Sequence, residues 1–309
     1  MTSQSPARPS AFMWLTTVMA VGHLAFVTAA GRLRWEHAVV DLLVVGLAWI
    51  GPRTRRFLRG GFPLWLSGML MDSQGLWLGW RGDIHTGDLF ALDGRVFPAP
   101  AGAANWPAYL AERSHVVLDL LCGFGYATYL FEVFAVVIIF FVAKHPRFEQ
   151  LCWSFLVVNV VGVATYMLYP AAPPWYVLTH GLGPADLAVA PSAAGAARFD
   201  AFFGIQYFHN FYSRNQNVFG AMPSLHSAYP VLVLWHTWHR GPLWRVGAGL
   251  FSALIAFSAV YLSHHYVLDV TAGMTAALLA CMAVELAFAR QLAPVPVPVP
   301  LTPGGDTRA

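Results

Sequence analysis

The stretch from Gly220 to Asp269 contains two polar motifs, Gly220-Ala221-Met222-Pro223-Ser224-Leu225-His226-Ser227 and Ser263-His264-His265-Tyr266-Val267-Leu268-Asp269. Each motif lies at the edge of a hydrophobic run, where an ionisable side chain is costly and therefore indicates a functional site. His265 and Asp269 are four residues apart, so on a helix they share one face and the carboxylate reaches the imidazole. This pairing is typical of a nucleophile and the group that orients it. His226 is the candidate for the matching general acid.

The two motifs together favour phosphoryl transfer over a structural role. A single histidine at a membrane edge is more often an interfacial polar residue, but two complementary motifs on one side of the membrane are not explained that way. Pro223 and Ser224 precede an apolar helical run, and Tyr266 begins another, so two helix N-termini are expected to converge on one phosphate. We expect the imidazoles of His226 and His265 to face each other across a gap sized for one phosphoryl group.

The expected reaction divides between the three side chains. Neutral His265 would attack phosphorus in line, while Asp269 holds its tautomer and stabilises the imidazolium that forms. His226 would protonate the leaving oxygen and then deprotonate the acceptor hydroxyl. Electrostatic stabilisation of the equatorial phosphoryl oxygens is the main demand on such a site.

The composition predicts a membrane protein with several spans. Hydrophobic residues make up 57% of the 309 residues and charged residues only 11%, with a mean hydropathy of +0.55. A soluble domain carries about 25% charged residues, roughly twice this share. The net charge of +3 lies in short loops and does not imply a nucleic-acid partner. Cys122, Cys152 and Cys281 fall within expected spans and predict neither a disulfide framework nor a metal site.

We therefore expect an all-α polytopic membrane protein with about eight transmembrane helices, with six as the main alternative. The expected spans are residues 11–30, 36–51, 61–80, 115–143, 150–169, 222–238, 246–264 and 266–288. The fourth is long enough to begin as an interfacial helix and to span only from about Gly125.

Basic residues set the expected orientation. With eight spans, the basic residues of most short loops fall on one side of the membrane. The positive-inside rule makes this side cytoplasmic. These basic residues are Arg53, Arg55, Arg56, Arg59, Lys144, Arg147, Arg240, Arg245 and Arg290. Arg32 and Arg34 fall on the other side, against the rule. We expect a bacterial inner-membrane protein with both termini cytoplasmic and both motifs at the non-cytoplasmic face.

Two longer segments are expected at the face that carries the motifs. Residues 81–113 predict a polar, slightly acidic cap. The aromatic run from Phe199 to Tyr212 suits a helix in the headgroup layer, which either anchors the loop or contacts substrate. We divide the chain into an N-terminal pair of spans with a basic loop (1–60), a catalytic membrane core (61–290) and a flexible C-terminal tail (291–309), where alternating Pro and Val indicate an extended stretch.

Three stretches resemble the type 2 phosphatidic acid phosphatase superfamily and, within it, most of all the inositol phosphorylceramide synthases of fungi. They are Tyr169-Pro-Ala-Ala-Pro-Pro-Trp175-Tyr176, Phe219-Gly-Ala-Met-Pro-Ser-Leu-His-Ser227, and Tyr261-Leu-Ser-His-His-Tyr266 continuing to Asp269. The resemblance implies a six-helix phosphatase-like core preceded by two N-terminal spans. It also implies a catalytic triad of His226, His265 and Asp269.

The sequence departs from the phosphatases in the cations that bind phosphate. The phosphatases place an arginine six residues before the second catalytic histidine, and here that position is Ala259. Their first signature, a Lys and an Arg-Pro, is replaced by the Pro-Pro-Trp segment. Both departures favour the synthase-like branch. The expected substrate-binding residues are Ser224, His264, Arg214, Arg198 and Trp175.

The implied function is a lipid phosphotransferase. A phosphoryl headgroup, such as inositol phosphate from phosphatidylinositol, passes through a phosphohistidine to a lipid hydroxyl such as that of ceramide, and diacylglycerol is released. The partners are therefore a phospholipid donor, a lipid-hydroxyl acceptor and the bilayer, while the oligomeric state stays open. We expect no cofactor and no metal, because no Asp/Glu cluster of the kind that binds Mg²⁺ lies near the motifs.

Two alternatives remain at this point. A lipid phosphate phosphatase, acting on phosphatidate or a polyprenyl phosphate, would use water as the acceptor. A transporter would place paired ionisable groups near the membrane midplane. Five acids lie in or near the expected spans, and we expect each to have a helix-end or hydrogen-bonded interior role instead. They are Asp41, Asp72, Asp119, Glu132 and Glu285.

Overall fold

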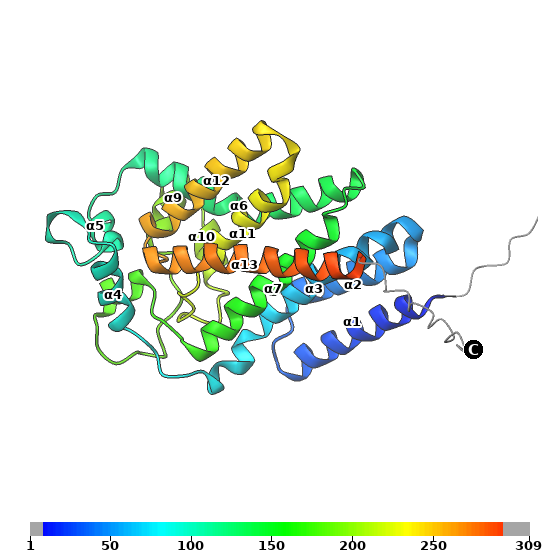
Figure 1. The fold of residues 1–309 in the computed structure, drawn as a ribbon. Coiled ribbons are helices and arrows are strands. Elements are labelled where there is room, and N and C mark those ends of the chain that lie inside the picture. Colours follow the sequence, from blue (N-terminus) through cyan, green and yellow to red (C-terminus); the bar gives the residue numbers. More distant parts are fainter. Residues whose placement is uncertain (1–8, 293–309) are drawn as a thin grey trace, which may run out of the picture.

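Long helices run side by side in this protein, and short helices gather beyond one end of them (Figure 1). The computed structural model describes residues 9–292, and over this range the chain forms thirteen α-helices and four short 3₁₀ helices. The long helices are α1 (Ala11–Ala29), α2 (Trp35–Ile50), α3 (Pro52–Trp77), α6 (Val116–Val142), α7 (Phe148–Leu168), α11 (Leu225–Thr237), α12 (Pro242–Tyr261) and α13 (Val267–Leu292). The short ones are α4 (Asp88–Val96), α5 (Trp106–Ala111), α8 (Pro174–His180), α9 (Ala197–Phe203) and α10 (Tyr207–Tyr212).

Five helices are long and apolar enough to cross a membrane: α1, α6, α7, α12 and α13. The other three long helices differ in length or polarity. At a rise of 1.5 Å per residue, α11 is about 20 Å long, short of the roughly 30 Å hydrocarbon core. The chain is thus an integral membrane protein with five candidate spans. The expectation of about eight spans requires three further segments to cross the membrane and stays a prediction.

Helix α11 lies at the centre of the helical core. It packs against α6, α7, α12 and α13, and ten of its thirteen residues are buried. Such a helix needs no polar face, which explains its apolar sequence. The same four helices supply most of the main hydrophobic cluster around it. Its N-terminal turn, where His226 lies, is therefore held from all sides.

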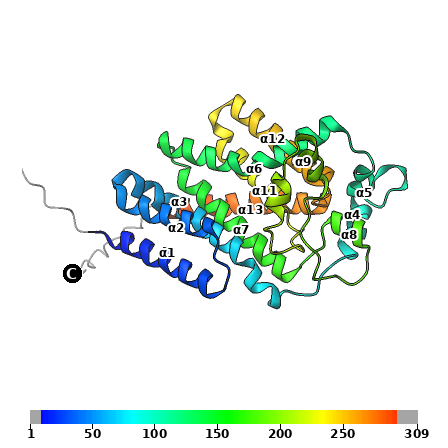
Figure 2. The ribbon, with the colours of Figure 1, turned by 180° about the vertical axis from the view of Figure 1, so that it is seen from behind.

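Helices α1, α2 and α3 form a second, smaller cluster beside this core, with α3 packed on α7 (Figure 2). The expected boundary between residues 60 and 61 lies inside α3. Leu58 and Trp65, on either side of it, are buried in the same small cluster. The division of the chain into an N-terminal pair and a catalytic core stays a prediction.

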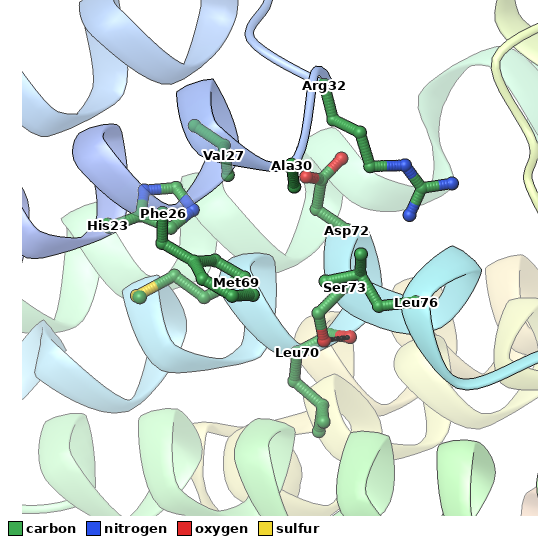
Figure 3. A pocket seen from close by; sticks show the side chains of 10 residues that line it. All are labelled: His23, Phe26, Val27, Ala30, Arg32, Met69, Leu70, Asp72, Ser73 and Leu76. Carbon is green, nitrogen blue, oxygen red and sulfur yellow. Dashed lines mark hydrogen bonds between the residues drawn. The ribbon is translucent and has the colours of Figure 1, made fainter.

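Two of the five acids expected in or near the spans, Asp41 and Asp72, lie in this part of the chain and are hydrogen-bonded. Asp41 accepts from Trp65 Nε1 at 3.1 Å and lies 2.7 Å from His23 Nδ1. Asp72 lies 2.9 Å from His37 Nε2 and also pairs with Arg34. Figure 3 shows His23 and Asp72 on the wall of a cavity of about 190 Å³ between α1 and α3.

Two of the other three acids expected in or near the spans are partnered in the same way. Asp119 pairs with Arg198 and Glu285 with Arg147, at 2.7 and 2.6 Å. Four of the five acids are therefore hydrogen-bonded; Asp41 is buried, whereas Asp72 and Glu285 are partly exposed. For the fifth, Glu132, the described residues offer no partner to Oε2.

One local expectation stays open and one differs from the structure. Residues 116–142 form one continuous helix, and the point along it where the membrane begins stays a prediction. The aromatic run forms two short helices, α9 and α10, because Gly204 adopts a left-handed conformation at φ +65° and ends α9. Phe202 and Phe211 are exposed on them, as an interfacial position requires. The expected extended stretch at 294–300 lies outside the described residues.

Candidate active site

The first wall of the site is the N-terminal turn of α11. Ser224 is its N-cap, and Ser224 Oγ accepts a hydrogen bond of 3.3 Å from the N–H of Ser227. The N–H of Ser224 donates to the carbonyl of Asp269 at 2.9 Å, and Tyr166 donates to the carbonyl of Pro223 at 2.9 Å. These bonds fix the position of His226 in the first turn, where the helix dipole favours an anion.

The second wall is the turn between α12 and α13. The N–H groups of His264 and His265 both donate to the carbonyl of Ala259, at 3.1 and 3.0 Å. Helix α13 begins only at Val267, so His265 precedes it rather than sharing a helical face with Asp269. At Gly273, a Cβ would overlap the carbonyl oxygen of Ser224. This glycine therefore lets α13 approach the start of α11.

The two catalytic candidates from these walls are in direct contact. His226 Nδ1 lies 3.0 Å from His265 Nε2, and both histidines are largely enclosed. His265 Nδ1 lies 2.8 Å from the carbonyl oxygen of Ala221. A carbonyl only accepts, so Nδ1 carries the proton and Nε2 presents its lone pair. His265 is thus held in the tautomer that a nucleophilic Nε2 requires.

This geometry corrects two expectations about His265. Asp269 Oδ2 is 3.6 Å from His265 Nδ1, too far for a hydrogen bond, so the carbonyl of Ala221 holds the tautomer instead. The carboxylate remains close enough to stabilise an imidazolium. There is also no gap between the imidazoles of His226 and His265, and a phosphoryl group must separate them to reach Nε2.

The N-terminus of α13 is occupied by carboxylates and does not face an empty phosphate site. Asp269 Oδ2 accepts from the N–H of Tyr266 at 2.8 Å. Asp93, reaching over from α4, accepts from the N–H of Leu268 at 2.8 Å. The expected convergence of two free helix N-termini on one phosphate is therefore wrong, and α11 alone supplies that feature.

Aromatic rings enclose the histidines. Tyr126 stacks on His226 with centroids 4.6 Å apart, and Tyr129 leans against the same ring at 4.9 Å. Tyr212 stacks on His264 at 4.4 Å. Sequence reasoning missed Tyr126 and Tyr129, because tyrosines within an apolar span look like ordinary core residues. Asp93 and Tyr212 belonged to segments with an expected role, the polar cap and the aromatic run, but neither was expected at the site.

Burial controls the charge of groups around the site that lie outside the spans. It lowers the pKa of His264 to about 3, with a smaller contribution from His265, so His264 is neutral near pH 7. Burial also raises the pKa of Asp93 to about 6, with the nearby charge of Asp269 acting in the same direction. The site is thus poor in permanent charge before substrate enters.

The remaining expected binding residues lie at different distances from the triad. His264 neighbours His226, with ring centroids 6.4 Å apart. Arg198 pairs with Asp119 at 2.7 Å and lies over the ring of Tyr261.

Arg214 and Trp175 have other partners. Arg214 pairs with Glu36 at the start of α2. The N–H of Trp175 donates to the carbonyl of Ser263 at 2.9 Å, which ties α8 to the histidine turn. Over residues 9–292, neither Arg198 nor Arg214 hydrogen-bonds to His226, His265 or Asp269. Within the same range, no group of three or more potential ligands has the geometry of a metal site.

The chain is similar to known proteins over most of its length. Residues 101–283 match the PAP2 superfamily. The phosphoinositol dihydroceramide synthase of Bacteroides thetaiotaomicron is 32% identical over 279 residues, covering 88% of this chain and 91% of that protein. The inositol phosphorylceramide synthase catalytic subunit of Schizosaccharomyces pombe is 31% identical over 203 residues, or 65% of this chain and 47% of the yeast protein. The Candida albicans inositol phosphorylceramide synthase is 32% identical over 55% of this chain and 36% of its own length. No solved structure matches the chain significantly.

Proposed function

Because this chain belongs to the PAP2 superfamily, we propose that it transfers a phosphoryl headgroup from a phospholipid to a lipid hydroxyl. The enzyme is a phosphotransferase of the inositol phosphorylceramide synthase type. The donor is phosphatidylinositol, the acceptor is ceramide or dihydroceramide, and the by-product is diacylglycerol. The names of the relatives give the phosphoinositol group and the ceramide or dihydroceramide acceptor, and phosphatidylinositol is the membrane lipid that we propose as the source of that group.

The reaction has two displacements at phosphorus. First, His265 Nε2 forms a bond to phosphorus while the bond from phosphorus to the diacylglycerol oxygen breaks. The imidazolium of His226, favoured once an anionic phosphodiester lies beside it, gives a proton to that oxygen. Then His226 takes the proton of the acceptor hydroxyl, whose oxygen attacks phosphorus and displaces His265. Asp269 offsets the positive charge of the phosphorylated imidazole.

The observation that carries this proposal is the burial of His265 and Asp269. His265 is 5% exposed and Asp269 is 0% exposed, and the rings of Tyr126, Tyr129 and Tyr212 surround the two neighbouring histidines. A site enclosed by aromatic rings disfavours bulk water as the acceptor and suits a lipid alcohol. This supports transfer over the phosphatase alternative.

The same proposal includes an arrangement in the membrane. We place α2 and α3 across the bilayer with the five candidate spans, and the segment 222–238, which contains α11, as the eighth. We keep the division into residues 1–60, 61–290 and 291–309. The histidines then lie at the non-cytoplasmic face of a bacterial inner membrane, with both termini cytoplasmic. Ser224 and His264 contact the phosphate, and Arg198, Arg214 and Trp175 lie further out as headgroup contacts.

A direct assay tests the function. Purified enzyme in detergent micelles is given phosphatidylinositol with and without ceramide. We expect diacylglycerol and inositol phosphorylceramide to form in equal amounts, and only when ceramide is present. Release of free inositol phosphate or inorganic phosphate at the same rate without ceramide would show a hydrolase instead. His265→Ala serves as the inactive control.

A further inference from the structure

An apolar groove runs between α2 and α6, with α3 as its floor. Its volume is about 650 Å³. The walls include Val40 and Leu43 of α2 and Phe134 and Ile138 of α6, all of which are exposed. On the floor, Gly68 presents no side chain, and a Cβ added there would meet nothing within 4 Å. The groove is therefore open toward lipid and is not filled by the protein itself.

The groove has the length of a lipid chain. Its floor extends along α3 from Leu58 to Asp72, which at a rise of 1.5 Å per residue is about 21 Å. One leaflet contributes about 15 Å, half of the roughly 30 Å hydrocarbon core. A single alkyl chain that lies along α3 is thus held over the whole depth of its leaflet.

Ionisable side chains gather at one end of this groove. Arg34, Glu36, His37 and Asp72 all line it there. Asp72 pairs with Arg34 and lies 2.9 Å from His37 Nε2. The side chains of Arg34 and Asp72 are 36% and 21% exposed, so this polar end is open rather than sealed. Ionisable groups in a membrane bundle are costly, and such a cluster indicates a functional site.

The groove is connected to the region of the catalytic candidates at two points. At its polar end, Glu36 pairs with Arg214, in the segment between α10 and the first motif. On its α6 wall, Phe134 also lines a smaller cavity that Tyr126 borders, and Tyr126 stacks on His226. Phe134 and Tyr126 are eight residues apart on α6, or about 12 Å along the helix. A lipid in the groove therefore lies next to the histidine pair.

The charges at the polar end favour a neutral headgroup. The guanidinium of Arg34 is paired with the carboxylates of Asp72 and Glu36, so it offers no uncompensated charge to a phosphate. The phosphodiester of the donor would bring a negative charge beside these two carboxylates. A ceramide carries no charge, and its hydroxyl and amide groups both donate and accept hydrogen bonds. This mixture matches the donors and acceptors of arginine, histidine and carboxylate side chains.

We propose that this groove docks the acceptor lipid, with one chain of ceramide along α3 and its hydroxyl and amide groups at the end formed by Arg34 and Asp72. The inference rests on the proposed function and names the acceptor docking site within it. Docking here keeps the acceptor beside α6 while the donor is cleaved. The acceptor hydroxyl is then close at hand for the second displacement.

The test fills the groove and measures KM for each lipid separately. In Gly68→Leu, the new side chain enters the space of the docked chain from α3, and in Leu43→Trp a larger ring enters it from α2. Neither residue belongs to the site around the histidines, and neither change removes a polar group. We expect KM for ceramide to rise about fivefold in each variant, the equivalent of one lost hydrogen bond. KM for phosphatidylinositol and the Tm should stay unchanged.

Matched controls make the same changes outside the groove. Gly22 is an exposed residue of α1 at which a Cβ meets nothing within 4 Å, so Gly22→Leu is the control for Gly68→Leu. Leu42 is exposed beside Leu43 but does not line the groove, so Leu42→Trp is the control for Leu43→Trp. We expect both controls to keep the wild-type KM for ceramide.

A direct labelling experiment separates docking from the reaction. Ceramide with a photoreactive group on its chain is irradiated with the wild-type enzyme in micelles, and the labelled peptides are identified. We expect labels on α2, α3 and α6, which unlabelled ceramide suppresses and equal amounts of phosphatidylinositol or diacylglycerol do not. Labelling should fall about fivefold in Gly68→Leu and stay unchanged in Gly22→Leu.

Four outcomes would overturn the inference. Suppression of the label by phosphatidylinositol would make the groove a donor site, and equal suppression by diacylglycerol would make it a by-product site. If the label falls elsewhere and neither groove variant changes KM while wild-type enzyme transfers to ceramide, the groove is not the docking site, although the proposed function stands. If the groove is labelled but ceramide is never an acceptor, the proposed function fails, and the acceptor role of the groove fails with it.

Discussion

His226 Nδ1 and His265 Nε2 are joined by a hydrogen bond of 3.0 Å. With His265 Nδ1 bound to the carbonyl of Ala221, the proton of this bond belongs to His226. The resting site is thus a closed pair in which His226, the proposed general acid, covers the lone pair of His265, the proposed nucleophile. A phosphoryl group that enters between them meets a nucleophile already in the required tautomer, with a proton donor on the opposite side.

The electrostatic role that we propose for the carboxylate of Asp269 can be separated from its structural role. In Asp269→Asn, the side-chain oxygen still accepts from the N–H of Tyr266, so we expect the fold to persist. The variant loses the negative charge 3.6 Å from His265 Nδ1, and we expect transfer to slow by about 10²–10⁴-fold. The rate of inositol phosphorylceramide formation and the Tm measure the two effects. Full turnover in this variant would contradict the assigned role.

Gly273 is expected to be intolerant of any side chain. In Gly273→Ala, the added Cβ overlaps the carbonyl oxygen of Ser224 and pushes α13 away from α11. Overpacking of this kind costs about 1–3 kcal/mol, and here it also separates His265 from His226. We expect a lower Tm and a loss of most activity.

Gly247→Ala in α12 is the control for the Gly273 variant, since a Cβ at that position meets nothing within 4 Å. Alanine is favoured over glycine inside a helix by about 0.5–1 kcal/mol. We expect this control to keep its activity and its Tm or to gain slightly in Tm. Equal Tm values for the two variants would show that α13 does not depend on the close approach.

Asp93 makes the stability of the protein depend on pH. Its pKa is raised to about 6 in the folded state, above the ordinary value near 4, so the folded protein binds this proton more tightly than the unfolded chain. The contribution of Asp93 to stability is therefore greatest below pH 4 and is lost as the pH rises from about 4 to 6. Asp93→Asn keeps an acceptor for the N–H of Leu268 without the charge. We expect its Tm, relative to wild type, to increase between pH 4 and pH 7; a difference independent of pH would contradict the shift.

The two arginines that we place near the headgroup should differ in their effect on stability. Arg198 pairs with Asp119, whose side chain is 12% exposed, so Arg198→Gln leaves a mostly buried carboxylate without its cation. We expect a loss of about 1.5–3 kcal/mol. Arg214 is 56% exposed in its pair with Glu36, and Arg214→Gln should cost less than about 1 kcal/mol. Denaturant unfolding in mixed micelles compares the free energies of unfolding of the two variants. A larger loss of stability for Arg214→Gln than for Arg198→Gln would contradict this prediction.

The sequence by itself determined the class of the protein and the candidate residues for its chemistry. Low charge and long apolar runs predict membrane helices, because a bilayer accepts only segments that satisfy their own backbone. The two motifs predicted helix starts near residues 224 and 266, and the structure places helix N-termini at Leu225 and Val267. They also marked His226 and His265 as a pair, which the structure brings into contact.

Only the tertiary structure decided how that pair is held. The carbonyl of Ala221 holds His265, and Asp93 caps α13 from 175 residues away in sequence. No local pattern encodes either contact, because a backbone acceptor has no residue type and a distant carboxylate depends on the path of the chain. The same is true of Tyr126 and Tyr212, whose rings become walls of the site only because α6 and α10 pack around the histidines. Local spacing can mark candidate reacting groups, whereas the partners that orient and enclose them come from long-range packing.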